Sequence, residues 1–348
     1  MKVKVLHLGF HSGCAKDVEY ACLQCGFDFT HRKFTDGVTE GNKIYNVSKE
    51  IANNAWESFE DYYNSFDLII TSDTAPISRV LIQNNFKKPL VVWICNRFDY
   101  FDNQTYDGSF PDKAYYDLFK EERENTVKVA YTAFEKIYAK LKRSDEDIKG
   151  LIQPFGAKTL GIEHDDESRG SGIPLDINKS EVFFIPPYRN DTEILNVARI
   201  LNDLGIANCA SRYGSPLELK DFKGVIHVPY AWSNLALFEN LNIGVVYFLP
   251  SLDFWKKLDE ENKPHGLFFS NPKLLNMLKY SEWYSEYNKD NFFFFDSWAH
   301  LKHLTTTITK EELEVKREAI IKRSKKRNEN NLNKWKNIFR NFNLLEEE

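Results

Sequence analysis

The order of apolar and polar residues in the first half of the chain predicts alternating strands and helices. Short apolar runs of strand length alternate with stretches whose apolar residues recur at helical spacing. The run PLVVWIC, residues 89–95, is continuously apolar, which is typical of a parallel strand covered on both faces. The expected strands are 3–10, 27–31, 67–71, 89–95 and 151–155. The expected helices are 17–24, 51–63 and 76–83, and the long polar-amphipathic stretch 112–141 is expected to supply further helix.

A second series of the same kind follows in the other half. Its expected strands are 182–185, 206–210, 224–227 and 245–249, and its expected helices are 192–204 and 233–242. Residues 310–343 have helical spacing and are dense in Lys and Arg, but they also carry several glutamates. This mixture indicates a solvated helix face rather than an arm that binds nucleic acid.

A polar segment separates the two series. Residues 164–180, HDDESRGSGIPLDINKS, are rich in Asp, Ser, Gly and Pro, which is typical of an interdomain linker or an exposed hairpin. We therefore expect a first domain over 1–165, a second over 180–310 and a helical tail over 311–348. The predicted fold class is α/β, with two doubly wound, Rossmann-like domains.

Length and charge narrow the class of protein. The chain has 348 residues, of which 42% are hydrophobic, so it can bury a sizeable core in two domains. Its net charge of −5 argues against a nucleic-acid partner for the whole surface. The longest apolar runs, 245–249 and 292–295, are far shorter than the ~20 residues of a bilayer span. The lysine-containing N-terminus lacks the long apolar stretch of a signal peptide, so we expect a cytoplasmic protein.

The cysteines predict reduced thiols rather than a disulfide framework. Their number, five, is odd and small for a chain of this length. Cys22 and Cys25 form a CxxC, but no second CxxC or nearby pair of histidines completes a zinc site. Because residues 18–25 have helical spacing, we interpret Cys22 as part of a buried helix face.

Candidate chemistry is sought just after each strand, because open parallel sheets bind ligands at the carboxyl ends of their strands. After the first strand, Gly9 to Gly13 has too few glycines for a dinucleotide fingerprint, and the chain contains no P-loop motif. His11 in this turn is a candidate general base, or a loop histidine that bonds a backbone carbonyl. After the strand 67–71, Asp73 or Thr74 could cap the next helix, and Asp73 could also contribute to an acceptor side.

A polar cluster follows the strand 89–95. Asn96, Arg97 and Asp99 stand at the carboxyl end of a very apolar strand, where polar groups indicate a ligand-binding edge. Asp99 is the second candidate for the general base, while Asn96 and Arg97 are assigned to the acceptor side. The alternative is that Arg97 and Asp99 pair only with each other.

In the second half, two segments suit a phosphorylated ligand. In the segment 210–216, Arg212 suits phosphate and Gly214 allows a close backbone approach, although an ordinary turn with a surface arginine has the same sequence. In the segment 227–251, Ser233 is the predicted N-cap of a helix whose positive end would bind a diphosphate. Glu239 on that apolar helix either bonds a ribose diol or is an exposed glutamate.

These features resemble the glycosyltransferases of the GT-B fold, in which two Rossmann-like domains face each other across a cleft. The segment 227–251 carries the likeness: a loop, a helix start, a helical Glu, and then Gly244 before a strand. The resemblance implies that Glu239 bonds the ribose and that Ser233 and Asn234 meet the diphosphate. It further implies a donor-binding set of Tyr188, Arg212, Tyr213, Gly214, Tyr230, Ser233, Asn234, Leu235 and Glu239, in which Arg212 neutralises the leaving diphosphate and Tyr188 lies near the base or sugar.

The likeness leaves the stereochemical outcome open. Many retaining members carry two glutamates in an EX7E motif, but position 231 here is Ala231. His11 is similar in placement to the base histidine of some inverting members. The likeness also implies that the final helix, near 332–339, crosses back to the first domain.

The resulting expectation is transfer of a sugar from a GDP- or UDP-sugar to a hydroxyl of a glycan or glycoprotein. GT-B enzymes generally need no metal, because the helix dipole and basic side chains stabilise the diphosphate, and we expect neither metal nor other cofactor here. The DxD at Asp145 to Asp147 lies in a charged helical stretch and is discounted as a metal site. The alternatives are a nucleotide-sugar epimerase of the same fold and a non-catalytic carbohydrate- or nucleotide-binding protein.

Overall fold

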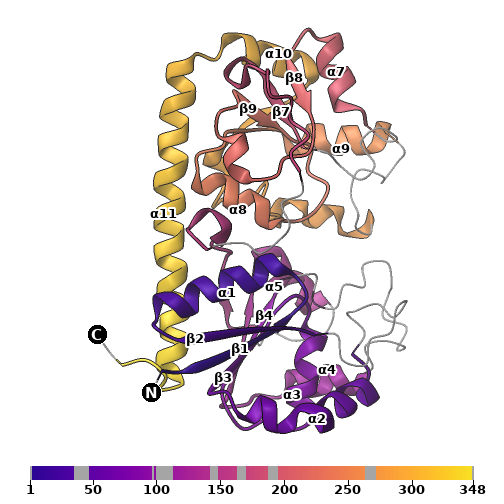
Figure 1. Ribbon diagram of the computed structural model, residues 1–348. Coiled ribbons are helices and arrows are strands. Elements are labelled where there is room, and N and C mark those ends of the chain that lie inside the picture. Colours follow the sequence, from indigo (N-terminus) through magenta and orange to yellow (C-terminus); the bar gives the residue numbers. More distant parts are fainter. Residues whose placement is uncertain are drawn as a thin grey trace. The chain divides into compact units, whose positions relative to one another are not determined.

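The chain contains two parallel sheets, each with its own helices (Figure 1). The computed structural model describes residues 2–34, 47–95, 98, 113–141, 148–162, 170–186, 195–262 and 272–346. By their contacts, Met1–Ala157 and Asn328–Glu348 form unit 1, and Lys158–Arg327 form unit 2. The predicted α/β class with two doubly wound sheets is confirmed, while the cleft between the domains stays a prediction.

Unit 1 has a six-stranded parallel sheet in the order β2-β1-β3-β4-β5-β6. Helix α1 lies on one side of it and helices α2 and α3 on the other (Figure 1). The centre of the sheet is apolar: every residue of β3 and β4 is buried, as expected for strands covered on both faces. The strands are β1 (Lys4–Gly9), β2 (Asp28–Lys33), β3 (Leu68–Thr71), β4 (Leu90–Ile94), β5 (Thr126–Ala130) and β6 (Gly150–Leu151), and the helices are α1 (Ser12–Gln24), α2 (Lys49–Asn64), α3 (Arg79–Gln83), α4 (Lys113–Lys120) and α5 (Ala133–Leu141), with short 3-10 turns at Ala75–Ser78 and Ala157–Thr159.

Two predictions for this unit were only partly right. The stretch 112–141 is helical only in part, because strand β5 separates α4 from α5. Its Lys128 is buried, and the amine donates to the carbonyl oxygens of Phe119 and Glu121, so a charged residue occupies an inner strand. The strand expected over 151–155 is only the two residues of β6, because the amide of Phe155 donates to the Asp17 carboxylate instead of a strand, at 2.8 Å.

Unit 2 has a five-stranded parallel sheet in the order β11-β10-β9-β7-β8. No element between residues 250 and 310 was assigned from the sequence, although residues 292–295 were noted as a strand-sized run. The strands are β7 (Phe183–Ile185), β8 (Asn208–Ala210), β9 (Gly224–Ile226), β10 (Tyr247–Pro250) and β11 (Phe292–Phe295), and the helices are α7 (Val197–Asp203), α8 (Leu235–Asn242), α9 (Leu252–Glu261) and α10 (Trp298–Thr307), with 3-10 turns at Lys179–Glu181, Pro216–Leu219, Pro272–Tyr280 and Lys289–Asn291.

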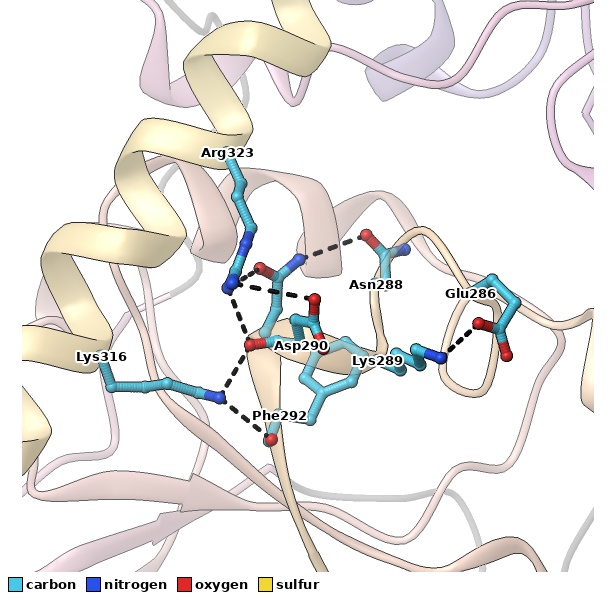
Figure 2. A network of polar contacts seen from close by, with 8 residues as sticks. Glu286, Asn288, Lys289, Asp290, Phe292, Lys316 and Arg323 are labelled. Carbon is cyan, nitrogen blue, oxygen red and sulfur yellow. Dashed lines mark hydrogen bonds and ion pairs between the residues drawn. The ribbon is translucent and has the colours of Figure 1, made fainter.

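The last helix, α11 (Lys310–Asn341), contributes residues to both units. In unit 2, Lys316 and Arg323 donate to the carbonyl oxygen of Asp290, at 2.7 and 2.8 Å (Figure 2). In unit 1, Asn331 donates to the carbonyl of Gln153 at 2.9 Å, and Trp335 packs against Trp93. The predicted helix is confirmed, and its crossing back to the first domain stays a prediction. No helix in the described part of the chain is both long and apolar enough to span a membrane.

Both sheets have the same strand order when each is numbered from its own first strand. In each sheet the first strand is an inner strand. The second strand pairs with one side of it, and the third strand pairs with its other side and is followed by the remaining strands in order. The direction changes between β1 and β3 in unit 1, and between β7 and β9 in unit 2. Ligands of open α/β sheets bind outside the carboxyl ends of the strands at such a switch point.

Candidate functional site

At the switch point of unit 1, the carboxylate of Asp73 fills the turn between β1 and α1. Its Oδ2 accepts hydrogen bonds from the amides of Phe10 and His11, at 2.7 and 3.2 Å, and from the hydroxyl of Ser72 at 3.1 Å. Gly9 is required here, because a Cβ on it would lie 2.8 Å from the same carboxylate oxygen. Asp73 is only 4% exposed, so a carboxyl group of the chain itself already occupies the amides of this turn.

Of the two predicted N-caps, Asp73 and Thr74, the structure has Thr74. Thr74 occupies the N-cap position of the 3-10 turn Ala75–Ser78 and makes no side-chain cap bond. Asp73 has a positive φ of 67°, which Asp tolerates better than most residues. Its backbone carbonyl accepts from the amide of Cys95 at 2.9 Å, so the residue joins the ends of β3 and β4.

His11 is exposed and caps helix α1 with its side chain. Its Nδ1 accepts a hydrogen bond from the amide of Gly13 at 3.2 Å, rather than donating to a carbonyl as the alternative interpretation had it. In the neutral ring this bond places the proton on Nε2. To accept a proton at Nε2, the neutral ring must first carry its own proton on Nδ1. His11 can therefore act as a base through Nε2 only after it gives up the cap bond.

Several predicted site residues lie outside the described residues. These are Tyr188 on the donor side, Asn96, Arg97 and Asp99 after β4, and the DxD at Asp145 to Asp147. Their predicted roles stay predictions. Among the described residues, no group of three His, Cys, Asp or Glu side chains has the arrangement of a metal site.

In unit 2, several backbone carbonyl groups of the segment between β9 and α8 accept hydrogen bonds from other parts of the unit. The indole of Trp255 donates to the carbonyl of Pro229 at 2.8 Å, and the indole of Trp283 donates to that of Ala231 at 2.9 Å. The amide of Glu282 donates to the carbonyl of Trp232 at 3.0 Å. Three carbonyl groups of one short loop are thus bound by elements that follow it in the chain.

The amide groups of the same segment, in contrast, have few acceptors. The N–H groups of Ala231 and of residues 233–236 donate to none of the described residues. The Ser233 hydroxyl is buried and likewise has no hydrogen-bond partner there. Residues 231–236, which we call the amide loop, therefore combine several unused donors with the positive end of helix α8.

The helix begins one residue later than predicted. Asn234, not Ser233, is the N-cap, because its Oδ1 accepts from the amide of Leu237 at 2.8 Å. This cap satisfies one of the first helical amides and leaves those of Leu235 and Ala236. The helix ends before Gly244, whose φ of 77° suits glycine, as the sequence indicated.

Glu239 is buried on α8, at 6% exposure, which rules out the interpretation as an exposed helical glutamate. It lies among tyrosines: burial raises the pKa of Tyr213 to about 12, with the negative charge of Glu239 the next contribution. Asn240 beside it donates to the hydroxyl of Tyr247 at 2.6 Å. The Glu239 carboxylate therefore lies on α8 close to polar and aromatic side chains.

The remaining donor-side predictions divide between exposed and half-buried positions. Arg212 and Gly214 are exposed, and the Gly214 amide donates to Glu218 at 3.3 Å. Tyr213, Tyr230 and Leu235 are half-buried. Tyr230 packs edge-on against His227, whose pKa burial lowers to about 3, so that this imidazole is neutral. Unit 2 thus gathers Tyr213, Tyr230 and Glu239 as polar groups, whereas the role of each stays a prediction.

Sequence reasoning missed Trp255 and Trp283. Both are buried, and each reaches back to a loop 26 and 52 residues earlier in the chain, respectively. No local pattern marks a tryptophan as the partner of a distant carbonyl, so only the fold reveals this role.

The sequence matches no protein-family model and none of the curated proteins. Solved structures do resemble the fold. A candidate UDP-N-acetylglucosamine 2-epimerase from Listeria monocytogenes is 10% identical, with 93% of this chain and 91% of that chain covered and a TM-score of 0.48.

Two other solved structures are similar at the same level. A DNA-modifying β-glucosyltransferase is 8% identical, with 98% of this chain and 99% of that chain covered and a TM-score of 0.48. A UDP-GlcNAc 2-epimerase from Neisseria meningitidis, bound to UDP-GlcNAc, is 14% identical, with 94% and 99% covered and a TM-score of 0.40. At these identities and scores the likeness carries no argument about activity, which has to come from the chain's own residues.

Proposed function

We propose that this chain is an enzyme acting on a nucleotide-diphosphate sugar, with the diphosphate bound by the amide loop of unit 2. One observation carries the proposal: the amides of Ala231 and of residues 233–236 have no acceptors among the described residues, while the carbonyls of Ala231 and Trp232 accept from Trp283 and Glu282. Backbone amides at a helix start are suited to the oxygens of a phosphate. The matching turn of unit 1 is filled by Asp73, which favours unit 2 as the donor side.

The other donor groups follow from this placement. Glu239 would accept hydrogen bonds from the ribose hydroxyls, because its buried carboxylate lies on α8 close to Tyr213 and hydrogen-bond donors stabilise a buried charge. Tyr213 and Tyr230 would contact the base or sugar, as would Tyr188. Exposed Arg212 would swing onto the diphosphate and neutralise charge as the sugar leaves. In this account the protein supplies the stabilisation without a metal.

The proposed reaction is transfer of the sugar from a GDP- or UDP-linked donor to a hydroxyl of a glycan or glycoprotein. The acceptor side would be unit 1, with Asp73, Asn96 and Arg97. His11 or Asp99 would take the acceptor proton, His11 by releasing its bond to the Gly13 amide. We further propose that the enzyme works in the cytoplasm.

An epimerase is the second candidate, because the donor side would be the same and no observation here requires an acceptor. The experiment incubates the protein with UDP- and GDP-sugars, with and without glycan acceptors, and separates the sugar products. Transfer predicts a new glycoside only when acceptor is present. A sugar isomer formed from donor alone would establish epimerisation instead.

A protein that only binds would give neither product. A thermal-shift series with UDP, GDP, ADP and CMP tests binding itself, since a ligand bound only by the folded state raises the melting temperature. A shift without turnover would favour the non-catalytic alternative. No shift with any nucleotide would contradict the proposed donor site.

A further inference from the structure

The C-terminal end of α8 is capped by a side chain from far outside the helix. The last carbonyl groups of a helix have no partner within it and need other donors. The amide of Ile243 donates to the carbonyl of Asn240, at 3.3 Å. The carbonyl of Glu239 accepts from the hydroxyl of Thr159, at 3.2 Å, across 80 positions of the chain. A threonine thus holds the backbone of the buried glutamate assigned above to the ribose.

That hydroxyl belongs to a continuous chain of hydrogen bonds. The Nδ2 of Asn242 donates to the Oγ1 of Thr159 at 3.0 Å. The Oδ1 of Asn242 accepts from Nη2 of Arg327 at 2.8 Å. A guanidinium can only donate, so it fixes the oxygen of the Asn242 amide toward itself and the nitrogen toward Thr159. The hydroxyl of Thr159 then donates its own proton to the Glu239 carbonyl.

Arg327 also suits this end of the helix by its charge and its packing. It donates to the last residue of α8, at the end where the helix dipole is negative. Its guanidinium lies 4.9 Å from the centre of the Phe238 ring. Just after the helix, a Cβ on Gly244 would lie 3.1 Å from the side chain of Ile321 on α11. The end of α8 therefore packs closely against α11.

The residues that cap α8 stand where the chain enters and leaves unit 2. Thr159 is the second residue of this unit, and Arg327 is its last. Two residues before Thr159, the amide of Ala157 donates to the buried carboxylate of Asp17, at 2.9 Å. The segment that carries the capping hydroxyl is thus itself fixed. The last turn of α8 is held by residues from both ends of the sequence of unit 2.

We propose that Thr159, Asn242 and Arg327 are positioning residues, which hold Glu239 where its carboxylate meets the ribose hydroxyls. The inference rests on the proposed function, because it needs a ribose at Glu239. The three residues bond the last turn of α8, whereas the amide loop precedes its first turn. Because the carbonyl and the carboxylate belong to one residue, a bond to the carbonyl limits the movement of the carboxylate. A carboxylate that is already held in place loses less entropy when a ligand binds.

The first test is Thr159→Val, which replaces the hydroxyl with a methyl group of similar size. Isothermal titration calorimetry with UDP and GDP should show an affinity about two- to tenfold lower, as for the loss of one neutral hydrogen bond. Thr159→Ser keeps the hydroxyl and should bind as the parent does. Thr305→Val is the matched control, because it removes another buried hydroxyl of unit 2, which donates to the Lys302 carbonyl at 3.0 Å. Its affinity should equal that of the parent.

Selectivity for ribose separates positioning from general destabilisation. The parent should prefer the better-bound nucleotide over its 2′-deoxy form, because the deoxy sugar lacks a hydroxyl for Glu239. Thr159→Val should lower this ratio of affinities, since a displaced carboxylate gains less from the hydroxyl. A loss of stability alone would lower both affinities and keep their ratio. In the Glu239→Ala variant, the further change Thr159→Val should have no additional effect on affinity.

The outcomes distinguish this inference from the proposed function. A ratio that falls in Glu239→Ala but keeps its parental value in Thr159→Val would overturn the positioning role and leave the function standing. A parent that binds no nucleotide, or that binds both forms equally, would overturn the inference together with the proposed role of Glu239. If Thr159→Val fails to fold, Arg327→Met decides the point, because it removes the bond to Asn242 and keeps an aliphatic stem beside Phe238. An unchanged ratio in Arg327→Met would then overturn the proposal.

Discussion

The switch points of the two sheets share a strand order but treat their backbone amides differently. In unit 1, Asp73 places its carboxylate on the amides of Phe10 and His11, and the His11 ring takes up that of Gly13. In unit 2, the amides of Ala231 and of residues 233–236 donate to none of the described residues, while the carbonyls of Ala231 and Trp232 accept from Trp283 and Glu282. At the edge in unit 1, the backbone amides therefore bind a carboxylate of the chain itself. At the edge in unit 2, the backbone amides are available to an anion from outside the chain.

We propose that this difference gives the two edges separate tasks. A turn that already holds a carboxylate repels a phosphate, so unit 1 is better suited to a neutral hydroxyl acceptor and to proton transfer. An edge with unused amides and a helix start favours a diphosphate. Each change below acts on one edge and predicts a response that the other edge would not give.

The largest effect is expected for Glu239→Ala, which removes the buried carboxylate from the donor helix. Hydrogen bonds to a charged group contribute about 1.5–3 kcal/mol, so nucleotide affinity should fall about 10- to 100-fold. Isothermal titration calorimetry with UDP and GDP measures this change. Asp259→Ala removes another buried carboxylate of unit 2, on α9, and is the control for general destabilisation. Equal affinity in Glu239→Ala and the parent would refute the assignment of Glu239 to the ribose.

A smaller loss is expected for Leu235→Pro, which removes a single amide. Proline is tolerated at the first position of a helix, and Asn234 before it already has an extended backbone, with φ −147° and ψ 153°. Losing one hydrogen bond to a phosphate should weaken nucleotide binding about tenfold.

Leu252→Pro is the matched control for that change. Leu252 is also a half-buried leucine at the first position of a helix, α9, in the same unit. It should bind nucleotide as the parent does. Similar losses in both variants would mean that the amide of Leu235 does not meet the diphosphate.

A change of a few fold is expected for Trp283→Phe, which keeps an aromatic ring but removes the bond to the Ala231 carbonyl. A neutral hydrogen bond contributes about 0.5–1.5 kcal/mol, so both the stability and the order of the amide loop should decrease slightly. Trp93→Phe removes an equivalent buried bond, from indole to the carbonyl of Ile152 at 3.0 Å, in unit 1. Thermal unfolding should respond to both variants, and nucleotide affinity to Trp283→Phe alone. An equal response of affinity to both would remove the loop from the account.

The smallest effect on nucleotide binding is expected for Asp73→Asn. Asn tolerates the positive φ at this position, so the turn should keep its shape while it loses the charge. The melting temperature should fall, because the amides of Phe10 and His11 lose a charged acceptor. Affinity for UDP or GDP should change less than twofold. A large loss of affinity would place the nucleotide in unit 1.

The sequence predicted most strands of both sheets, but it missed β5, whose apolar pattern a buried lysine interrupts, and it left β11 unassigned. The uninterrupted apolar run LVVWI predicts strand β4. The stretch that contains β5 is predicted as helix, because Thr126 and Lys128 break the apolar pattern of the strand. The amine of Lys128 is stable in the buried strand because it donates hydrogen bonds to two carbonyl groups of the preceding segment. That compensation is tertiary and leaves no mark in the local sequence.

At the candidate site, local signals gave the helix start and its buried glutamate, but not the loop's support. Ser233 and Asn234 are both favourable N-cap residues. N-cap propensity alone therefore cannot decide which of the two neighbouring positions starts the helix. The filling of the turn by Asp73 depends on a contact between residues 63 positions apart. The indole bonds that orient the amide loop span 26 and 52 positions. Local composition predicts the elements, whereas these long-range bonds decide which edge stays open.

A crystal of the protein soaked with UDP or GDP tests the central claim most directly, because it locates the diphosphate. The account predicts phosphate oxygens within hydrogen-bond distance of the amides of residues 233–236, and ribose hydroxyls at the carboxylate of Glu239. Nucleotide density at the β1–α1 turn of unit 1, or anywhere away from the start of α8, would contradict it.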